Sequence, residues 1–137
     1  MTPSMDSSSV GQLRAACDRM VHAERTRNLA DVMDLIWPDA VWLAPNMPPV
    51  LGAEAIRDLF SEFFELPFTG MTVGGINIRA SDSGDLGTVW GTFGLTFESP
   101  EGAATESMNF LMSWEQRDGA WKASANMFGS NTPQPED

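Results

Sequence analysis

The stretch ATESMNFLMSWEQ, residues 104–116, decides the fold class. From residue 106 onward every second side chain is large or long, and those between them are mostly small or polar. This alternation predicts a β-strand, because successive side chains of a strand point to opposite faces. The bulky face is predicted to meet the helices and line any cavity, and it carries Glu106, Met108, Phe110, Met112 and Trp114. The other face is predicted to meet solvent or a second subunit, and it carries Ser107, Asn109, Leu111 and Ser113.

The segments on either side of this strand have the same character. Residues 71–80, 86–98 and 120–130 are predicted strands, because turn-forming stretches separate them. The turn before the last strand contains Asp118-Gly119, a pair typical of tight hairpins. The second half of the chain is therefore predicted to form a curved antiparallel sheet.

The first half of the chain is predicted to be mostly helical. Residues 11–27 show the i, i+3, i+4, i+7 spacing of an amphipathic helix. A second, short helix is predicted over residues 29–37, where Pro38 stops it, and a third over residues 53–65. A short strand at residues 40–44 and a proline-rich turn connect these two helices. The predicted fold class is α+β, with three N-terminal helices packed on one face of the sheet.

Length and composition predict one domain. With 137 residues, 42% of them hydrophobic, the chain can bury one core. The domain is predicted to span residues 11–131, between a disordered polar lead at residues 1–10 and a loose tail at residues 132–137. The start shows no signal-peptide pattern, and no apolar run reaches the ~18 residues of a membrane span, so we expect a cytoplasmic protein.

Charge and residue usage argue against several kinds of site. The 8 Lys and Arg residues against 19 Asp and Glu give a formal net charge of −11, so nucleic acid and anionic membranes are not expected partners. His22 is the only histidine and has no cluster of metal ligands near it. With no glycine-rich phosphate loop either, neither a metal nor a cofactor is expected. Cys17 is the only cysteine, which excludes an intrachain disulfide, and it is interpreted as a buried helix residue.

Three stretches of sequence, in this order of elements, resemble a known superfamily. They are WPDAVWLAP at residues 37–45, PPVLGAEAIR at residues 48–57, and DGAWK at residues 118–122 running into NMFGSNTP at residues 126–133. The chain resembles the cone-shaped superfamily of nuclear transport factor 2 (NTF2), ketosteroid isomerase and SnoaL-like polyketide cyclases. Within it, the small SgcJ/EcaC-like (DUF4440) proteins are the most similar group. The resemblance implies an open cone with a blind apolar pocket for a small molecule.

The resemblance also implies that the catalytic set of ketosteroid isomerases is missing. Their general base, a carboxylate immediately before the proline of the first strand, corresponds to Ala44 here. Their tyrosine on the first helix falls near Val21, and their buried acid on the sheet falls near Phe110. Steroid isomerisation by that mechanism is therefore not expected.

The best candidate for a polar group in the pocket is Asn126. SgcJ-like proteins commonly have the sequence Asp-Met-Trp-Asn-Ser-Asp in the last strand, and this chain has NMFGSN there, at residues 126–131. The Asn126 amide can position a carbonyl or hydroxyl but cannot take a proton. Glu106 is the predicted proton acceptor if it is buried, and a carboxylate in water is the alternative. Glu24, one turn past Met20, is interpreted as part of a solvated helix face, and a position facing the pocket is the alternative. The predicted substrate-binding residues are Val21, Trp42, Asn46, Phe60, Phe63, Met108, Phe110, Met112 and Phe128.

Two hypotheses about function follow. The first is a natural-product tailoring enzyme that binds a polyketide-like or isoprenoid-like molecule and promotes a cyclisation, isomerisation or dehydration. The second is a non-catalytic ligand-binding or accessory protein, which the absence of acids at positions 44, 126 and 131 favours. A homodimer that pairs through the open face of the sheet is predicted in either case.

Overall fold

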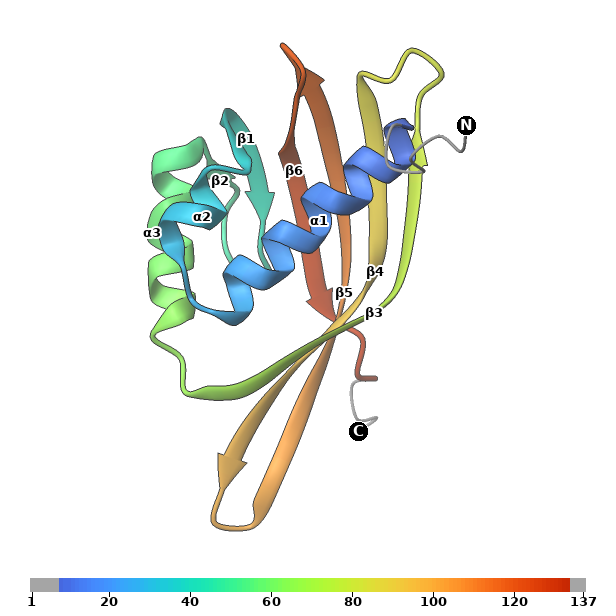
Figure 1. Ribbon diagram of the computed structural model, residues 1–137. Helices are drawn as coiled ribbons and strands as arrows, with labels where there is room; N and C mark the ends of the chain where they lie inside the picture. Colours follow the sequence, from blue (N-terminus) through green and yellow to red (C-terminus); the bar gives the residue numbers. More distant parts are fainter. Residues whose placement is uncertain (1–7, 134–137) are drawn as a thin grey trace.

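The computed structural model describes residues 8–133, which form three helices and one six-stranded sheet (Figure 1). The helices are α1 (Ser9–Arg25), α2 (Leu29–Met33) and α3 (Ala53–Phe64). The strands are β1 (Ile36–Leu43), β2 (Val50–Leu51), β3 (Phe68–Ala80), β4 (Leu86–Ser99), β5 (Gly102–Arg117) and β6 (Ala120–Ser130). They lie in the order β2-β1-β6-β5-β4-β3, and every neighbouring pair is antiparallel except β1 and β6, which are parallel. The predicted α+β class, with helices first and an antiparallel sheet after them, is confirmed.

The second helix is shorter than predicted. α2 ends at Met33, and Ile36 and Trp37 belong to β1. Parallel pairing with β6 explains the difference, because Ile36 lies opposite Ala123 and the Ala123 N–H donates to the Leu35 carbonyl at 2.8 Å. Pro38 falls in the irregular part of this pairing, where the ladder needs no N–H donor. It therefore lies within the strand and does not stop the helix.

The ends of the domain differ slightly from the predicted boundaries. α1 begins at Ser9, and the Ser8 hydroxyl caps it by accepting from the Gly11 N–H at 3.0 Å, so residues 8–10 are not part of a disordered lead. The rest of the predicted lead, residues 1–7, and residues 134–137 of the predicted tail lie outside the described residues.

Three β-bulges in the antiparallel ladders bend the sheet and make one of its faces concave. One lies in β3 between Gly74 and Asn77, a second lies in β3 between Phe68 and Gly70, and a third lies opposite the Ser113–Trp114 step of β5. A bulge adds one residue to a strand and increases its local bend and twist. The backbones approach closely at the first bulge, where a Cβ on Gly91 would lie 2.9 Å from the Gly74 carbonyl oxygen. Glycine at position 91 therefore allows the sheet to fold around its concave side.

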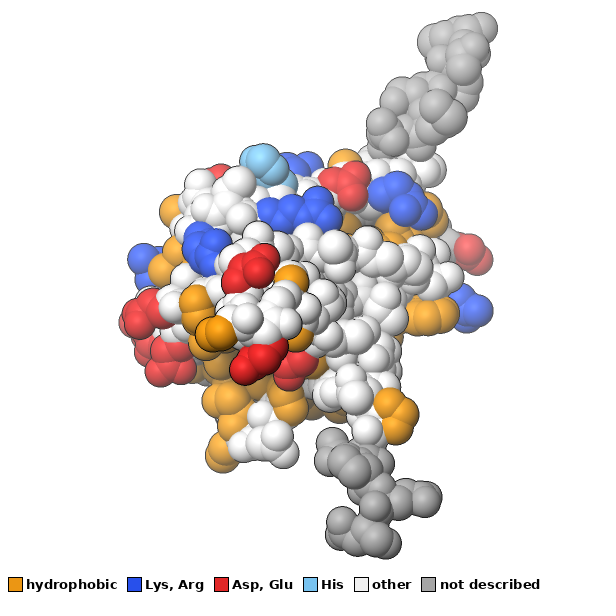
Figure 2. All heavy atoms as spheres, turned by 90° about the horizontal axis from the view of Figure 1, so that it is seen from below, with side chains coloured by type: hydrophobic (Ala, Val, Ile, Leu, Met, Phe, Trp, Pro, Cys, Tyr) orange, Lys and Arg blue, Asp and Glu red, His pale blue; other side chains and the backbone are white. Residues whose placement is uncertain are grey.

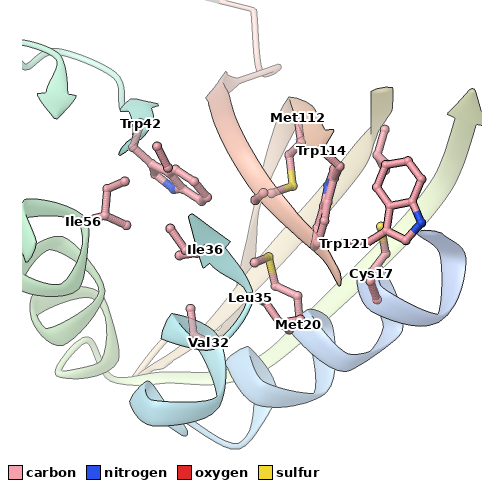
Figure 3. Close-up of a cluster of buried hydrophobic side chains, with 14 of the residues drawn as sticks. Cys17, Met20, Val32, Leu35, Ile36, Trp42, Ile56, Met112, Trp114 and Trp121 are labelled. Carbon is pink, nitrogen blue, oxygen red and sulfur yellow. The ribbon is translucent and has the colours of Figure 1, made fainter. Parts of the chain in front are cut away.

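The helices cover the concave face and close one end of the space between the two layers. α1 crosses the sheet diagonally, and α3 lies beside β1 and β2 (Figure 1). Trp42, Trp114 and Trp121 are buried with side chains from α1, α2 and α3 in one hydrophobic cluster (Figure 3). This cluster is the closed end of the cone, and the cavity described next adjoins it.

Candidate ligand cavity and its polar residues

A cavity of about 460 Å³ lies between the helices and the concave face of the sheet. Its volume is in the range of small-molecule binding pockets. Most of its wall is apolar and includes residues of α1, α3 and strands β1, β3, β4, β5 and β6. The carboxylate and amide side chains of this wall are Glu24, Glu62, Glu106 and Asn126, and no Lys, Arg or His among residues 8–133 lines it.

The strand register arranges the sheet wall of the cavity in rows. Trp42, Asn126, Met112 and Val89 lie side by side across four strands and form a row at the floor, with Trp114 of β5 beyond it. The pair Phe110 and Phe128 follows, and then Met108 beside Phe93 and Val73. The outermost row with cavity-lining residues on three strands is Glu106, Leu95 and Met71, and Phe97 of β4 lines the cavity beyond it. Trp42 is 2% exposed whereas Glu106 is exposed, so the rows run from the floor of the cavity to its rim.

Most residues predicted for substrate binding line this one cavity. They are Val21, Trp42, Phe60, Phe63, Met108, Phe110, Met112 and Phe128. Asn46 does not line the cavity, because it occupies an exposed turn with a φ of 63° in the left-handed region. Asparagine tolerates this conformation better than most residues, which gives Asn46 a structural reason to be there.

Asn126 lies on the cavity floor with an unsatisfied acceptor. It is the register partner of Met112 on one side and Trp42 on the other. Its Oδ1 is buried and has no hydrogen-bond partner among the described residues. Buried amide oxygens are rarely left unpaired, so this atom is available to a ligand.

Glu106 lies far from Asn126. Six residues separate Glu106 from Met112, the register partner of Asn126, which is roughly 20 Å along an extended strand. The Glu106 side chain is exposed at the rim. The two residues predicted to act together therefore cannot contact the same group of a small ligand.

Glu24 is the acid that the structure places within the wall, so its interpretation as a solvated residue is wrong. Cys17, Met20, Val21 and Glu24 follow one face of α1 and all line the cavity. The residue is half-buried on the cavity wall. Burial raises the pKa of Glu24 from 4.5 to about 8, because an apolar surrounding disfavours the charged form. The spacing of seven residues from Cys17 placed Glu24 on the apolar stripe, which was the available sequence signal.

Cys17 and His22 offer no reactive group to the cavity. Burial raises the pKa of the Cys17 thiol to about 12, with a further contribution from Asp18, so the thiol stays protonated at neutral pH. His22 is exposed and does not line the cavity. Within residues 8–133, no group of three or more His, Cys, Asp or Glu side chains is placed to hold a metal ion.

Residues 17–124 match the SnoaL-like domain family. The chain belongs to this family. Its fold is shared by LinA, at 22% identity and a TM-score of 0.75, over 93% of this chain and 92% of that chain. A ketosteroid isomerase-like protein from Erwinia carotovora atroseptica is 14% identical with a TM-score of 0.75, over 92% of this chain and 98% of that chain. An NTF2-like protein of unknown function from Pseudomonas putida is 13% identical with a TM-score of 0.77, over 91% and 88%.

These matches confirm the predicted NTF2-like and SnoaL-like superfamily. The narrower similarity to SgcJ-like proteins stays a prediction. The comparison with curated proteins gave no match. As for the membrane, none of the helices between residues 8 and 133 has the length and apolar character needed to cross one.

Proposed function

We propose that this SnoaL-like protein is a cofactor-independent enzyme that binds a small, largely apolar molecule and moves a proton within it. The class of reaction would be an isomerisation, cyclisation or dehydration of the kind used in natural-product tailoring, on a polyketide-like or isoprenoid-like substrate. The observation that carries the proposal is the position of Glu24, a half-buried acid with a raised pKa, on the wall of a cavity that is otherwise mostly apolar.

Glu24 is suited to both giving and taking a proton near neutral pH. With a pKa of about 8, it is protonated in about nine molecules out of ten at pH 7, and the remainder is carboxylate. A general acid or base is most effective when its pKa is close to the working pH. The protonated form can donate to a hydroxyl or carbonyl oxygen, and the carboxylate can then take a proton from a carbon of the same substrate.

The rest of the cavity would act by holding the substrate in one conformation. Aromatic side chains surround its middle, where Phe93 lies 6.1 Å from Phe110 and 6.2 Å from Phe128 between ring centroids. Such walls exclude water and restrict a flexible chain, which lowers the entropic barrier to cyclisation. Asn126 would orient a polar group of the substrate. The role predicted for Glu106 stays a prediction, and its exposure favours Glu24 as the proton-transfer group.

The outer face of the sheet supports a homodimer as the working form. Trp90, Leu111 and Met127 are neighbours in the register, and they are 52%, 52% and 54% exposed. The residues that surround them on this face include Thr88, Thr92, Asn109, Ser113, Ala125 and Gly129, and the charged side chain beside them is basic, Arg79 opposite Thr88. Because each chain carries a net charge of −11, two copies can approach closely only through a surface without acids. A paired sheet face would also bury the exposed apolar side chains.

The test begins with the molecules that the purified protein retains. Small molecules extracted from the protein are identified by mass spectrometry and incubated with wild type and the Glu24→Gln variant. Glutamine keeps the shape of glutamate but cannot transfer a proton, so turnover is expected to fall by about 100-fold or more while binding persists. Glu62→Gln is the matched control, because Glu62 lies on the cavity wall but is exposed. Undiminished turnover by Glu24→Gln would refute the assigned role, and a ligand returned unchanged by wild type would favour a carrier.

A further inference from the structure

Two buried polar atoms at the floor of the cavity lack hydrogen-bond partners. They are the indole Nε1 of Trp114 and the amide Oδ1 of Asn126, and both residues line the cavity. Trp114 is 0% exposed, so water outside the cavity does not reach its N–H group. An unpaired buried donor or acceptor is costly, and each one in a folded protein needs an explanation.

The two residues are neighbours on the concave face. Asn126 lies directly opposite Met112, and Trp114 is two residues further along β5 on the same face. Diagonal neighbours of this kind have Cα atoms roughly 7–8 Å apart, with the Cβ atoms somewhat closer, which long side chains can span. Figure 3 shows Met112 and Trp114 extending from β5 on the same side of the sheet. A ligand group that inserts between these two side chains from the cavity would therefore lie near both unpaired atoms.

We propose that Trp114 Nε1 and Asn126 Oδ1 form a polar subsite that recognises a hydroxyl group on a neutral, otherwise apolar ligand. This inference rests on the proposed function, since it takes the cavity to be the ligand site. An indole N–H only donates, and an amide oxygen only accepts. A hydroxyl group does both, so it accepts from Trp114 and donates to Asn126.

A ketone or an ammonium group satisfies only one of the two atoms. A ketone accepts from Trp114 but leaves the Asn126 oxygen unpaired. An ammonium group donates to Asn126 but leaves the indole N–H of Trp114 unpaired. A hydroxyl is the smallest common group that matches both atoms.

The charges around the cavity exclude an anionic ligand. No basic residue of the described part of the chain lines the wall. Arg25 donates to the Met71 carbonyl at 3.1 Å, and Arg27 donates to the carbonyls of Phe64, Leu66 and Phe68. Seen from below, acidic side chains lie among hydrophobic ones on the surface (Figure 2). A carboxylate or phosphate would lose its hydration without gaining a cation, which strongly disfavours its burial.

Four naphthalene derivatives separate these possibilities by calorimetry at pH 7. Naphthalene has no polar group, 2-methoxynaphthalene only accepts, 2-naphthol donates and accepts, and 2-naphthoate is anionic. We expect 2-naphthol to bind about tenfold more tightly than naphthalene, 2-methoxynaphthalene to lie between them, and 2-naphthoate to bind most weakly.

Variants test whether the tighter binding of 2-naphthol depends on Trp114 Nε1 and Asn126 Oδ1. Asn126→Leu and Trp114→Phe should each reduce the advantage of 2-naphthol over naphthalene to about threefold or less. Trp121→Phe is the control, because the Trp121 indole already donates to Gln12 at 3.3 Å and does not line the cavity. It should keep the full advantage.

A measurement on wild type covers the case in which Trp114→Phe does not fold. The indole N–H resonance of Trp114 should move further downfield with 2-naphthol than with naphthalene, as expected for a new hydrogen bond. Equal affinities for naphthalene and 2-naphthol, or tightest binding of 2-naphthoate, would overturn the inference while leaving the apolar cavity as a ligand site. Binding of none of the four probes would overturn the proposed function and this inference with it.

Discussion

Replacing Glu24 by glutamine tests the raised pKa of this carboxyl without any knowledge of the ligand. Burial raises the pKa of Glu24 from 4.5 to about 8 in the folded protein, whereas the unfolded chain keeps the ordinary value. Between these two pH values the folded state holds a proton that the unfolded state has released, so the free energy of unfolding falls as pH rises. Below pH 4.5 both states are protonated and the effect vanishes.

The expected magnitude follows from the separation of the two pKa values. Each pH unit above 4.5 lowers the free energy of unfolding by about 1.4 kcal/mol, up to the folded-state pKa. At pH 7 the upper limit is therefore about 3 kcal/mol. Glutamine does not ionise, so Glu24→Gln should be more stable than wild type by up to about 3 kcal/mol at pH 7 and by about zero at pH 4.

Urea unfolding followed by tryptophan fluorescence at pH 4, 5.5, 7 and 8.5 measures this difference. The other carboxyl groups titrate in both proteins, so their effects cancel when variant and wild type are compared at each pH. Glu62→Gln, which replaces an exposed acid on the same cavity, should change the free energy of unfolding by less than about 0.5 kcal/mol throughout. A Glu24→Gln difference that does not depend on pH would refute the burial of this carboxyl group.

Three other predictions concern the rim, the outer face and the thiol. Glu106→Gln should leave turnover of any substrate within about threefold of wild type, because Glu106 is exposed; a 100-fold loss would restore it as the proton acceptor. Light scattering should give twice 14.9 kDa for wild type. Trp90→Glu and Leu111→Glu should yield monomers, whereas Leu51→Glu, at a 66% exposed position on β2, should not; a monomeric wild type would contradict the pairing. The Cys17 thiol should react with a disulfide reagent at pH 8 at least about 100-fold more slowly in the folded protein than in urea; equal rates would show that it is accessible.

Side-chain alternation predicted the concave wall because the period of a strand is fixed. Once residues 104–116 are a strand, Met108, Phe110 and Met112 must share a face, and all three line the cavity. The apolar stripe of α1 is equally local, since the spacing that identifies the helix also identifies its buried face.

Features that depend on distant partners could not be predicted in this way. The local sequence pattern predicts Ile36 and Trp37 at the end of a helix, and only their place beside β6 shows that they belong to strand β1. Glu24 is interpreted from the sequence as part of a solvated helix face, and only the packing of α1 against the sheet shows that it lines the cavity. The unpaired N–H of Trp114 has no sequence signal, because a tryptophan on a buried strand face usually finds a partner.

The positions of the polar groups divide the cavity into two chemical regions. Asn126 and Trp114 lie at the floor, beside the hydrophobic cluster. Glu24 lies near the C-terminal end of α1, and the next residue, Arg25, donates to the carbonyl of Met71 in the outermost row. The aromatic row of Phe110 and Phe128 separates the floor from that outer row. Under the proposed function, a ligand anchored by its hydroxyl at the floor would present a carbon atom some distance along its chain to Glu24. The length of the ligand and the position of its reactive group would then decide which neutral molecules this protein converts.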